Sequence, residues 1–536
     1  MQAERRGVVL VVGVLLISAA LGGILGPSVK ATAAGANDLQ DAVKNFTHVL
    51  AIVQQNYAVP VDMDRAIYQG SIPGMLRVLD PHSNFYDSRQ FNLLREDQRG
   101  KYYGVGMTVA PRDGRTVVLA PFVGSPAYKA GIRPGDIILK VDEKPAEGLS
   151  TAEVADMLKG AKGTTVRITV IREGYDEPLL FTITRDEIPR HAVDMVFLLK
   201  PGIGYVRLSG FNETTDRDLT EALKSLGVSK LDGLVLDLRA NPGGLLNEGV
   251  AVADMFLDRG QLIVTHRGRS SPPRSYSAIR GNQGVEVPLV VLINGNSASA
   301  AEIVAGAIQD HDRGLLVGEN SFGKGLVQTV SQLGENTGLA LTTAKYYTPS
   351  GRLIQRDYKA VSLYEYHYNR KTNNQPTEIK LTASGRQVYG GGGITPDVTV
   401  ALVRLNEFQT RLLTRDVFFP YEQGVGGFTR WFMGRKPEIT REFKVNEEVL
   451  SQFRRFLDRQ GIRYTEPELA ENQAWIQRKI KKEVFTSEFG LSDGFRVELE
   501  EDPQVQKAIE VLPQARALYQ NAKKVIAQRT GAQPRQ

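Results

Sequence analysis

Residues 289–303 read LVVLINGNSASAAEI, an apolar run followed by a polar turn and then by small residues. The run Leu289 to Ile293 predicts a buried strand, and Ala300 to Ile308 predict the helix that follows. Such a strand-to-helix corner projects a side chain and aims backbone N–H groups at one point, which suits a nucleophile beside an oxyanion site. Ser297 and Ser299 are the candidate nucleophiles of this corner. Taken alone, a serine here is more often the N-cap of the helix.

Strands and helical stretches alternate on both sides of this corner, between residues 204 and 400. A second pair consists of the predicted strand Leu234 to Leu238 and the helical stretch Leu245 to Leu257. The alternation predicts an α/β fold with a partly parallel sheet. The strand ends in a turn with the paired glycines Gly243 and Gly244, which allow close approach of a substrate carbonyl but are equally explained by a plain tight turn.

Residues 318–325, GENSFGKG, follow the apolar run Leu315 to Val317 and match a phosphate-binding loop through Lys324. In that motif the residue after the lysine is Ser or Thr, which holds magnesium, whereas here it is Gly325. Nucleotide binding is therefore the weakest of the functional interpretations. Lys324 is either a surface lysine in a glycine-rich turn or a residue with another chemical role.

A β-rich region lies between Tyr103 and Arg185, where short β-branched runs are broken by glycine and interrupted by the predicted helix Thr151 to Leu158. The predicted strands are Val105 to Val109, Thr116 to Ala120, Asp136 to Val141, Val166 to Ile171 and Phe181 to Thr184.

Helical patterns predominate near both ends of the chain. From Leu39 to Tyr57, apolar residues at spacings of three and four predict an amphipathic helix that packs on another element, and Ile67 to Leu79 predict a shorter one. In the tail, Val449 to Leu457 carry an apolar stripe that ends before Gly461, and residues 465–468 form a capping box.

Composition excludes several functional classes. A length of 536 residues predicts about three folded units and tails, and 42% hydrophobic with 24% charged residues is typical of globular proteins. The net charge of +6 is too thinly spread to indicate nucleic-acid binding. The absence of cysteine excludes disulfides, a thiolate nucleophile and Cys-ligated zinc. None of the six histidines lies in a recognisable triad motif, and Ala301 breaks the Gly-x-Ser-x-Gly pattern.

The first residues indicate export. Arg5 and Arg6 precede Val8 to Gly26, an uncharged apolar run that is a signal-peptide core, a membrane anchor or, as the least favoured alternative, a buried helix. Ala31-Thr32-Ala33 offers small residues for cleavage, so a cleaved signal and an anchor both stay open. In either case the positive-inside rule keeps the arginines in the cytoplasm. We therefore expect an extracytoplasmic protein, in the periplasm or on the outer face of the cytoplasmic membrane.

From about residue 38 to residue 400 the chain resembles the carboxy-terminal processing peptidase family, or tail-specific proteases, which are secreted serine proteases with a Ser-Lys dyad. The resemblance rests on motifs in the family's order. They are Leu79-Asp80-Pro81-His82-Ser83, the PDZ-like run of residues 124–136, the turn from Asp237 to Gly244, Ser297-Ala298-Ser299-Ala300, Phe322-Gly323-Lys324-Gly325 with Gln328, and Tyr347-Thr348-Pro349-Ser350-Gly351-Arg352. The polar stretch from Asp357 to Gly390 and the tail beyond residue 401 depart from it.

The resemblance implies that Ser299 is the nucleophile, Lys324 the general base and Gln328 the residue that positions the lysine. It also implies an oxyanion hole made by the backbone N–H groups of Gly243 and Ala300. In a PDZ fold the carboxylate of a bound tail is held by a glycine-containing loop, and that loop corresponds here to Gly104, Val105, Gly106 and Met107.

The expected fold is a multidomain chain of α/β and β classes, with a crotonase-like α/β protease core. The expected parts are a signal or anchor at 1–35, an N-terminal helical cap at 36–100, a PDZ domain at 101–188, the peptidase core at 189–400 and a helical C-terminal region at 401–536.

A lysine can act as a base only when it is neutral, so the enzyme must lower its pKa from ~10.4 by burial. We expect Phe322, Leu326 and Val327 to supply an apolar lining around Lys324. Gln328 lies four residues on and can hold the amine without adding charge.

The main hypothesis is an exported serine endopeptidase that binds protein tails with free C-termini through its PDZ domain. The alternative is a non-catalytic PDZ scaffold. We expect no metal, no organic cofactor and no nucleic-acid partner. Membrane attachment depends on whether residues 8–26 are cleaved, and homodimerisation and a regulatory partner stay open.

Overall fold

The structure is a computed structural model that describes residues 34–112, 114–172, 174–359, 362–368, 378–415, 417–418, 427–435 and 438–530. It divides into two compact units, Met1–Val78 and Leu79–Gln536. The predicted apolar run 8–26 lies outside the described residues. Within the described ranges, no helix combines the length and the apolar character that crossing a membrane requires.

The helices of the first unit form where the spacing predicts them, but the longer one does not bury its apolar stripe. Leu39 is 65% exposed and Phe46 is 46% exposed. What covers this stripe stays a prediction, because periodicity reports which face is apolar and not what packs on it. The helices are α2 (Ala34–Asn56), the π-helical η1 (Arg65–Ser71) and α3 (Ile72–Leu79).

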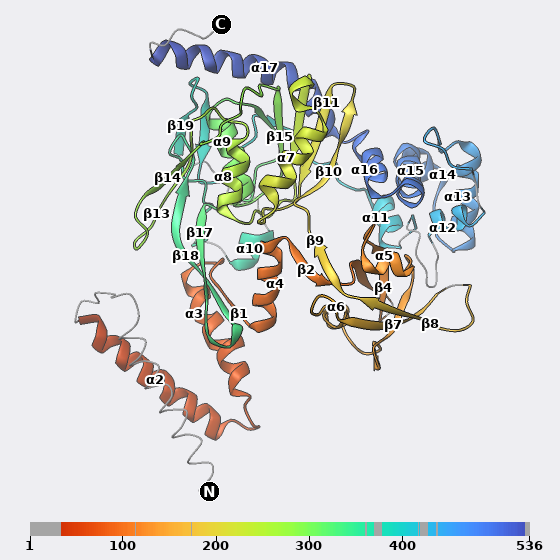
Figure 1. Ribbon diagram of the computed structural model, residues 1–536, viewed down its shortest axis with the longest axis horizontal. Helices are drawn as coiled ribbons and strands as arrows, with labels where there is room; N and C mark the ends of the chain where they lie inside the picture. Colours follow the sequence, from red (N-terminus) through yellow and green to blue (C-terminus); the bar gives the residue numbers. More distant parts are fainter. Residues whose placement is uncertain are drawn as a thin grey trace. The chain divides into compact units, whose positions relative to one another are not determined.

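A PDZ-like domain, drawn in orange and gold in Figure 1, forms part of the second unit. Its antiparallel sheet has the order β3-β4-β5-β7-β8, with β6 beside β5, so β3 is an edge strand. A core that includes Val118, Ile138 and Val166 packs against α6. The elements are β2 (Lys101–Gly104), β3 (Met107–Arg112), β4 (Arg115–Pro121), α5 (Pro126–Ala130), β5 (Ile137–Val141), β6 (Lys144–Pro145), α6 (Thr151–Leu158), β7 (Thr165–Ile171), β8 (Leu179–Thr184) and β9 (Asp186–Pro189).

The central sheet of the second unit has the order β10-β11-β12-β15-β16-β21 and is parallel from β11 onward, which confirms the predicted partly parallel sheet. Alternate residues of its strands pack on opposite faces, as the period of two requires. The elements are β10 (Val193–Lys200), β11 (Ile203–Leu208), α7 (Thr215–Ser225), η2 (Val228–Lys230), β12 (Gly233–Asp237), α8 (Leu246–Asp254), β15 (Leu289–Ile293), α9 (Ala300–Asp310), β16 (Leu315–Gly318) and β21 (Val398–Thr399).

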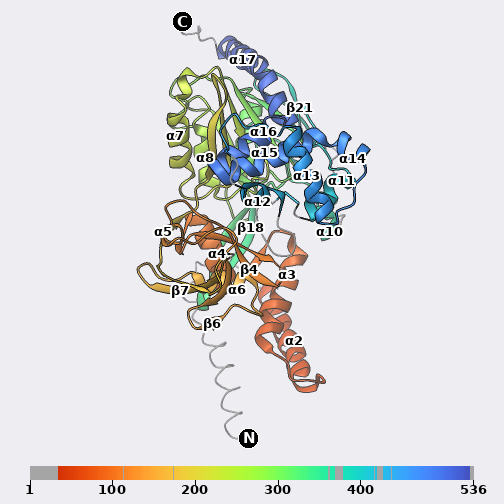
Figure 2. The ribbon, with the colours of Figure 1, turned by 90° about the vertical axis from the view of Figure 1, so that its right-hand side faces the viewer.

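Helices cover both faces of this sheet. On one face Leu236 and Val291 pack against α7, α8 and α9, while on the other Val235 and Val290 pack against α17 (Pro503–Thr530). In Figure 2, α7 and α17 lie on opposite sides of the strands. A helix more than 180 residues beyond β15 thus completes the core, which the motifs before residue 400 do not foretell.

A second sheet, with the order β1-β18-β13-β14 and with β17 paired to β18, lies beside α4. The polar stretch after residue 357 supplies one short helix and a hairpin in its described part. The elements are β1 (Asn84–Tyr86), α4 (Ser88–Arg99), β13 (Leu262–Arg267), β14 (Arg274–Ser277), β17 (Leu326–Gln332), η3 (Gly334–Asn336), β18 (Gly338–Tyr347), α10 (Leu363–Tyr368), β19 (Glu378–Leu381) and β20 (Gln387–Gly390).

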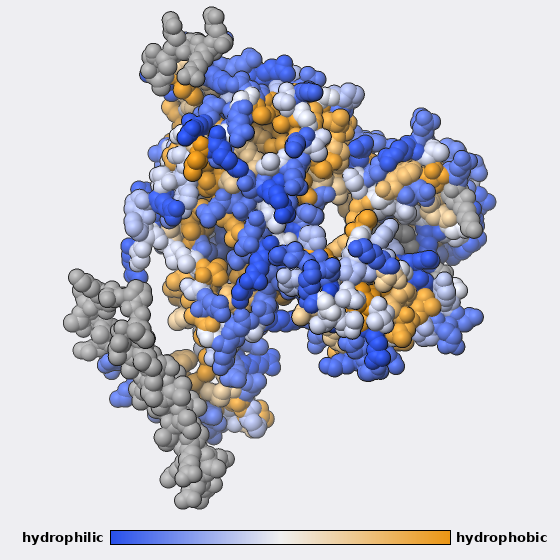
Figure 3. All heavy atoms as spheres, viewed as in Figure 1, coloured by the Kyte–Doolittle hydropathy of each residue, from blue (hydrophilic) through white to orange (hydrophobic). Residues whose placement is uncertain are grey.

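Short helices between residues 407 and 499 share a separate aromatic core. The stripe predicted from Val449 to Leu457 is buried, and Thr465 forms its predicted capping box with Glu468. The outer surface of these helices is predominantly hydrophilic in Figure 3. The helices are α11 (Glu407–Thr414), α12 (Phe428–Met433), α13 (Glu447–Arg459), α14 (Glu466–Glu471), α15 (Gln473–Phe489) and α16 (Leu491–Leu499).

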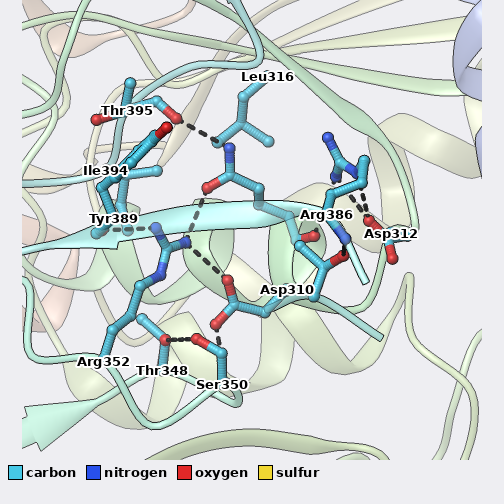
Figure 4. A network of polar contacts seen from close by, with 12 residues as sticks. Asp310, Asp312, Leu316, Thr348, Ser350, Arg352, Arg386, Tyr389, Ile394 and Thr395 are labelled. Carbon is cyan, nitrogen blue, oxygen red and sulfur yellow. Dashed lines mark hydrogen bonds and ion pairs between the residues drawn. The ribbon is translucent and has the colours of Figure 1, made fainter. Parts of the chain in front are cut away.

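A buried polar network fixes the C-terminal end of α9 (Figure 4). Arg352 is fully buried and pairs with Asp310 at 2.7 Å, while it also donates to the carbonyl of Tyr389 at 2.8 Å. Arg386 pairs with both Asp312 and Asp397. Removing one partner of such a buried pair typically costs about 3–5 kcal/mol. The motif that ends at Arg352 therefore anchors α9.

Candidate active site

The candidate nucleophile Ser299 stands at the junction of β15 and α9, in the N-cap position of the helix. Its φ is +55°, which is uncommon for a residue other than glycine. Strained backbone of this kind costs roughly 1–3 kcal/mol and persists where the surroundings over-determine it. Being an N-cap does not exclude a nucleophilic role here, because the strained corner aims the residue into a cavity.

That cavity, of about 630 Å³, brings together four of the five predicted catalytic and oxyanion residues. Ser299, Lys324, Gln328 and Gly243 all line it, together with Tyr346. Lys324 Nζ donates to Gln328 Oε1 at 2.8 Å. A serine hydroxyl, a lysine amine and a neutral amide therefore share one site, as the resemblance implies.

Burial lowers the pKa of Lys324, because the charged ammonium loses its water. The carboxylates of Glu302 and Asp80 oppose this shift by favouring the charged form. Of the three apolar residues that the sequence predicts around the lysine, Leu326 and Val327 line the cavity with it, whereas Phe322 does not. A lysine in this environment is neutral more often than a free one and can accept a proton.

Glu302 ties the two candidate catalytic residues together, a role that the sequence reasoning missed. Its fully buried carboxylate accepts hydrogen bonds from the N–H groups of Ser299 at 2.8 Å and Lys324 at 2.9 Å. It also accepts from Gly323 N–H and Ser321 Oγ. The Ser-x-x-Glu capping-box spacing between residues 299 and 302 was the available signal.

Tyr346, also without a role in the sequence analysis, joins the same residues through their carbonyls. Its buried hydroxyl lies 3.1 Å from the oxygen of Ser299 and 2.6 Å from that of Lys324. Glu302 thus binds the N–H groups, and Tyr346 the carbonyl groups, of the same two residues.

The motif from Leu79 to Ser83 supports Gln328. Asp80 accepts hydrogen bonds from the N–H groups of His82 and Ser83, which closes a tight turn. The His82 carbonyl then accepts a hydrogen bond from Gln328 Nε2, whose Oε1 holds Lys324. This turn therefore fixes which end of the Gln328 amide faces the lysine.

The two predicted oxyanion donors differ in availability. The N–H of Ala300, at the first position of α9, has no acceptor within the described ranges. The N–H of Gly243 donates to Asn241 Oδ1 at 2.8 Å. Gly243 needs its bare backbone (φ +92°), because a Cβ there would lie 2.7 Å from Ser299 Cβ. The Gly243 N–H is thus adjacent to the nucleophile but already engaged.

Ser297, the other serine of the corner, has a structural role. It is fully buried, its hydroxyl donates to the carbonyl of Leu238 at 2.8 Å, and it accepts from Asn294 N–H at 2.9 Å. These bonds link the ends of β12 and β15.

The predicted tail-binding residues Gly104 to Met107 do not line this cavity; they run from the last residue of β2 to the first residue of β3 in the PDZ-like domain. The Gly106 carbonyl accepts from Ser125 Oγ at 2.7 Å, and a Cβ on Gly106 would lie 2.5 Å from Ser125 Cβ. In the described part of the chain, nothing accepts a hydrogen bond from the Gly106 N–H. Gly106 is itself buried, and its unpaired backbone donor directly precedes the edge strand β3.

The nucleotide interpretation of residues 318–325 does not fit the structure. A phosphate-binding loop leads into a helix, whereas this segment leads from β16 into strand β17. The Lys324 amine points to Gln328 instead.

Comparisons with known proteins show the family to which the chain belongs. Residues 202–363 match peptidase family S41, and residues 117–172 match the PDZ domain. The carboxy-terminal-processing protease of Bartonella bacilliformis is 42% identical over 314 residues, which cover 58% of this chain and 72% of that protein. The carboxy-terminal processing protease CtpA of Bacillus subtilis is 35% identical over 307 residues, which cover 57% of this chain and 65% of that protein.

A solved photosystem II D1 C-terminal processing protease is 33% identical to the chain, and the match covers 64% of this chain and 84% of that structure, with a TM-score of 0.35.

Proposed function

Because the chain belongs to the S41 family of carboxy-terminal processing proteases, which are serine peptidases, we propose that Ser299 and Lys324 form its catalytic dyad. The observation that carries this proposal is the shared cavity, in which a lysine with a lowered pKa lies with a serine on a strained corner. The direct test is cleavage of an unfolded protein by the purified chain, compared with Ser299→Ala.

In the proposed reaction, neutral Lys324 takes the proton of Ser299 Oγ as that oxygen attacks the carbonyl carbon of the scissile peptide bond. The C–N bond then breaks, the lysine returns its proton to the leaving amine, and an acyl ester remains on Ser299. Water attacks the ester by the same route in reverse, which releases the acid and restores the serine.

Negative charge develops on the carbonyl oxygen during both steps and requires N–H donors. Ala300 N–H is available in this structure, whereas Gly243 N–H must first leave Asn241. Gln328 supports the proposed base because its neutral amide holds the amine without stabilising the ammonium as a carboxylate does.

We further propose that the PDZ domain selects substrates by their free C-termini. Strand β3 lies at the edge of its sheet, where a peptide adds as an extra strand, and the loop before β3 presents the Gly106 N–H to a carboxylate. A tail bound there is tethered to the protease, and its upstream segment is the substrate.

Replacement of Gly106 by Val should weaken binding of a tailed peptide by about 10- to 100-fold, the size of one or two charge-assisted hydrogen bonds. The Cβ would collide with Ser125, and the positive φ disfavours any side chain. Amidation of the peptide C-terminus should weaken binding to the wild type similarly. Isothermal titration measures both.

Gly148→Val is the matched control, since Gly148 has the same φ of +78° but open space at its Cβ position. Equal binding of free and amidated peptides by the wild type would contradict carboxylate recognition. Cleavage of a short untailed peptide by Gly106→Val separates two roles of the PDZ domain. If this cleavage is preserved, the domain only tethers tailed substrates. If it falls as much as cleavage of tailed substrates does, peptide binding to the domain activates the protease.

We also propose an extracytoplasmic location, based on Arg5, Arg6 and the apolar run 8–26. In a bacterial host, a protease added to intact spheroplasts should degrade the chain, or the chain should be released with the periplasmic fraction. Full protection until the cells are lysed would contradict export.

A further inference from the structure

Helix α10 (Leu363–Tyr368) lies in the polar stretch outside the resemblance, yet one of its residues is built into the support of the site. Tyr366 is 2% exposed, and its ring lies edge-on to those of His82 and Phe322. The Arg356 guanidinium lies over the Tyr366 ring at 4.5 Å. The ring is therefore held by packing, independently of its hydroxyl.

Two polar partners of the Tyr366 hydroxyl lead toward the site. Gln355 Nε2 donates to this hydroxyl at 3.1 Å, and His82 Nε2 lies 2.9 Å away. A tyrosine hydroxyl has one hydrogen to give, and among the described residues its one acceptor is His82 Nε2. The chain of donors therefore runs from Gln355 through Tyr366 to His82, which assigns the imidazole hydrogen to Nδ1.

Both partners lead to Lys324. The backbone carbonyl of His82 accepts from Gln328 Nε2, and Gln328 Oε1 holds the lysine amine. On the other side, Gln355 Oε1 accepts from the N–H of Gly325, the residue after the lysine, at 2.8 Å. One hydroxyl thus joins the turn that holds Gln328 to the backbone that carries Lys324.

We propose that the Tyr366 hydroxyl is a positioning group for the Ser299–Lys324 dyad, acting through His82 on Gln328 and through Gln355 on the lysine backbone. This inference rests on the proposed function. Without the hydroxyl, the His82 turn and Gly325 lose their common partner, and Lys324 gains freedom to move toward water.

His82 and Tyr366 do not change protonation state near neutral pH. Burial lowers the pKa of His82 to about 3, with Lys324, His367 and Arg356 acting in the same direction and Asp80 opposing them. Burial raises the pKa of Tyr366 to about 12. Around Lys324, Glu302 and Asp80 favour the ammonium. Between about pH 3 and about pH 12, His82 and Tyr366 therefore each keep one protonation state. A change in the pH profile of activity then reports on Lys324.

The test is Tyr366→Phe in the full chain, with kcat and KM measured from pH 6 to pH 10 on a peptide without titrating groups. We expect kcat to fall about tenfold, equivalent to ~1.4 kcal/mol, with KM unchanged. We also expect the rising limb of the kcat profile to move to higher pH, because a better hydrated lysine has a higher pKa and is neutral only at more alkaline pH.

Tyr364→Phe is the matched control, on the same helix but with a side chain that is 72% exposed, and it should behave as the wild type. His82→Phe removes the same hydrogen bond from its other end and should reproduce the shift. The pH profile of the double variant His82→Phe/Tyr366→Phe should shift little further, because both substitutions remove the same contact.

Unchanged kcat and an unmoved limb in Tyr366→Phe, with the wild-type melting temperature, would overturn the proposal. So would unfolding of both Tyr366→Phe and His82→Phe, since it would show that the contact supports the fold. These results differ from those that would contradict the proposed Ser299–Lys324 dyad. In that case the pH profile of the wild type would lack the rising limb assigned to Lys324, or Ser299→Ala would remain active.

Discussion

Ser299→Ala should reduce cleavage by about 10⁴- to 10⁶-fold, the loss expected when a serine protease loses its nucleophile. The fold should survive, because the alanine keeps the backbone N–H that donates to Glu302. We therefore expect an unchanged melting temperature and no product from an unfolded protein substrate on a gel.

Ser297→Ala is the matched control, two residues away in the same corner. Its buried hydroxyl bonds to the backbones of Leu238 and Asn294, so its loss should lower stability by about 1–3 kcal/mol and leave substantial activity. The reverse pattern, with Ser299→Ala active and Ser297→Ala inactive but folded, would mean that the wrong serine has been identified.

Lys324→Arg should be as inactive as Lys324→Met, with kcat lower by about 10³-fold or more in each. Arginine keeps the positive charge, but its guanidinium stays protonated and cannot accept the serine proton. Methionine keeps the apolar stem and removes the amine. Steady-state cleavage of a short peptide measures the loss.

Lys345→Arg, on the exposed side of β18, is the control and should retain wild-type activity. Substantial activity in Lys324→Arg would show that the residue contributes charge and not a base. That outcome would leave the protease assignment intact but remove the dyad.

The fold class was predictable because local patterns agreed with the tertiary arrangement. Leu289 to Ile293 is apolar at every position, as a strand buried on both faces requires, and α9 follows it at the predicted residue. The same holds for α6, whose predicted bounds are those observed. The predicted domain boundaries stay predictions, since they depend on contacts that no local pattern records.

The parts of the fold that the sequence did not predict depend on long-range packing. Helix α17 covers a face of the central sheet, and Arg239 of the Asp237 turn pairs with Asp502, just before that helix, at 2.7 Å. Nothing in the tail's periodicity indicates which surface it covers. For α2, likewise, the periodicity gives the apolar face but not the surface that covers it.

Within the site, the sequence indicated Ser299, Lys324 and Gln328 through motifs, but not the groups that hold them. Glu302 belonged to a quoted segment without a role, and Tyr366 lay in a stretch that resembled nothing. Both act through hydrogen bonds to residues distant in sequence, and such bonds leave no spacing to recognise.

The central claim is that a neutral lysine removes the serine proton, and the pH dependence of wild-type kcat/KM tests it most directly. On a substrate without titrating groups, the rate should rise tenfold per pH unit and level off through a single ionisation below pH 10.5, because burial lowers the pKa of Lys324. The low residual rate of Lys324→Met should lack this limb. A wild-type profile that is flat from pH 6 to pH 10, or a limb that persists unchanged in Lys324→Met, would contradict the account.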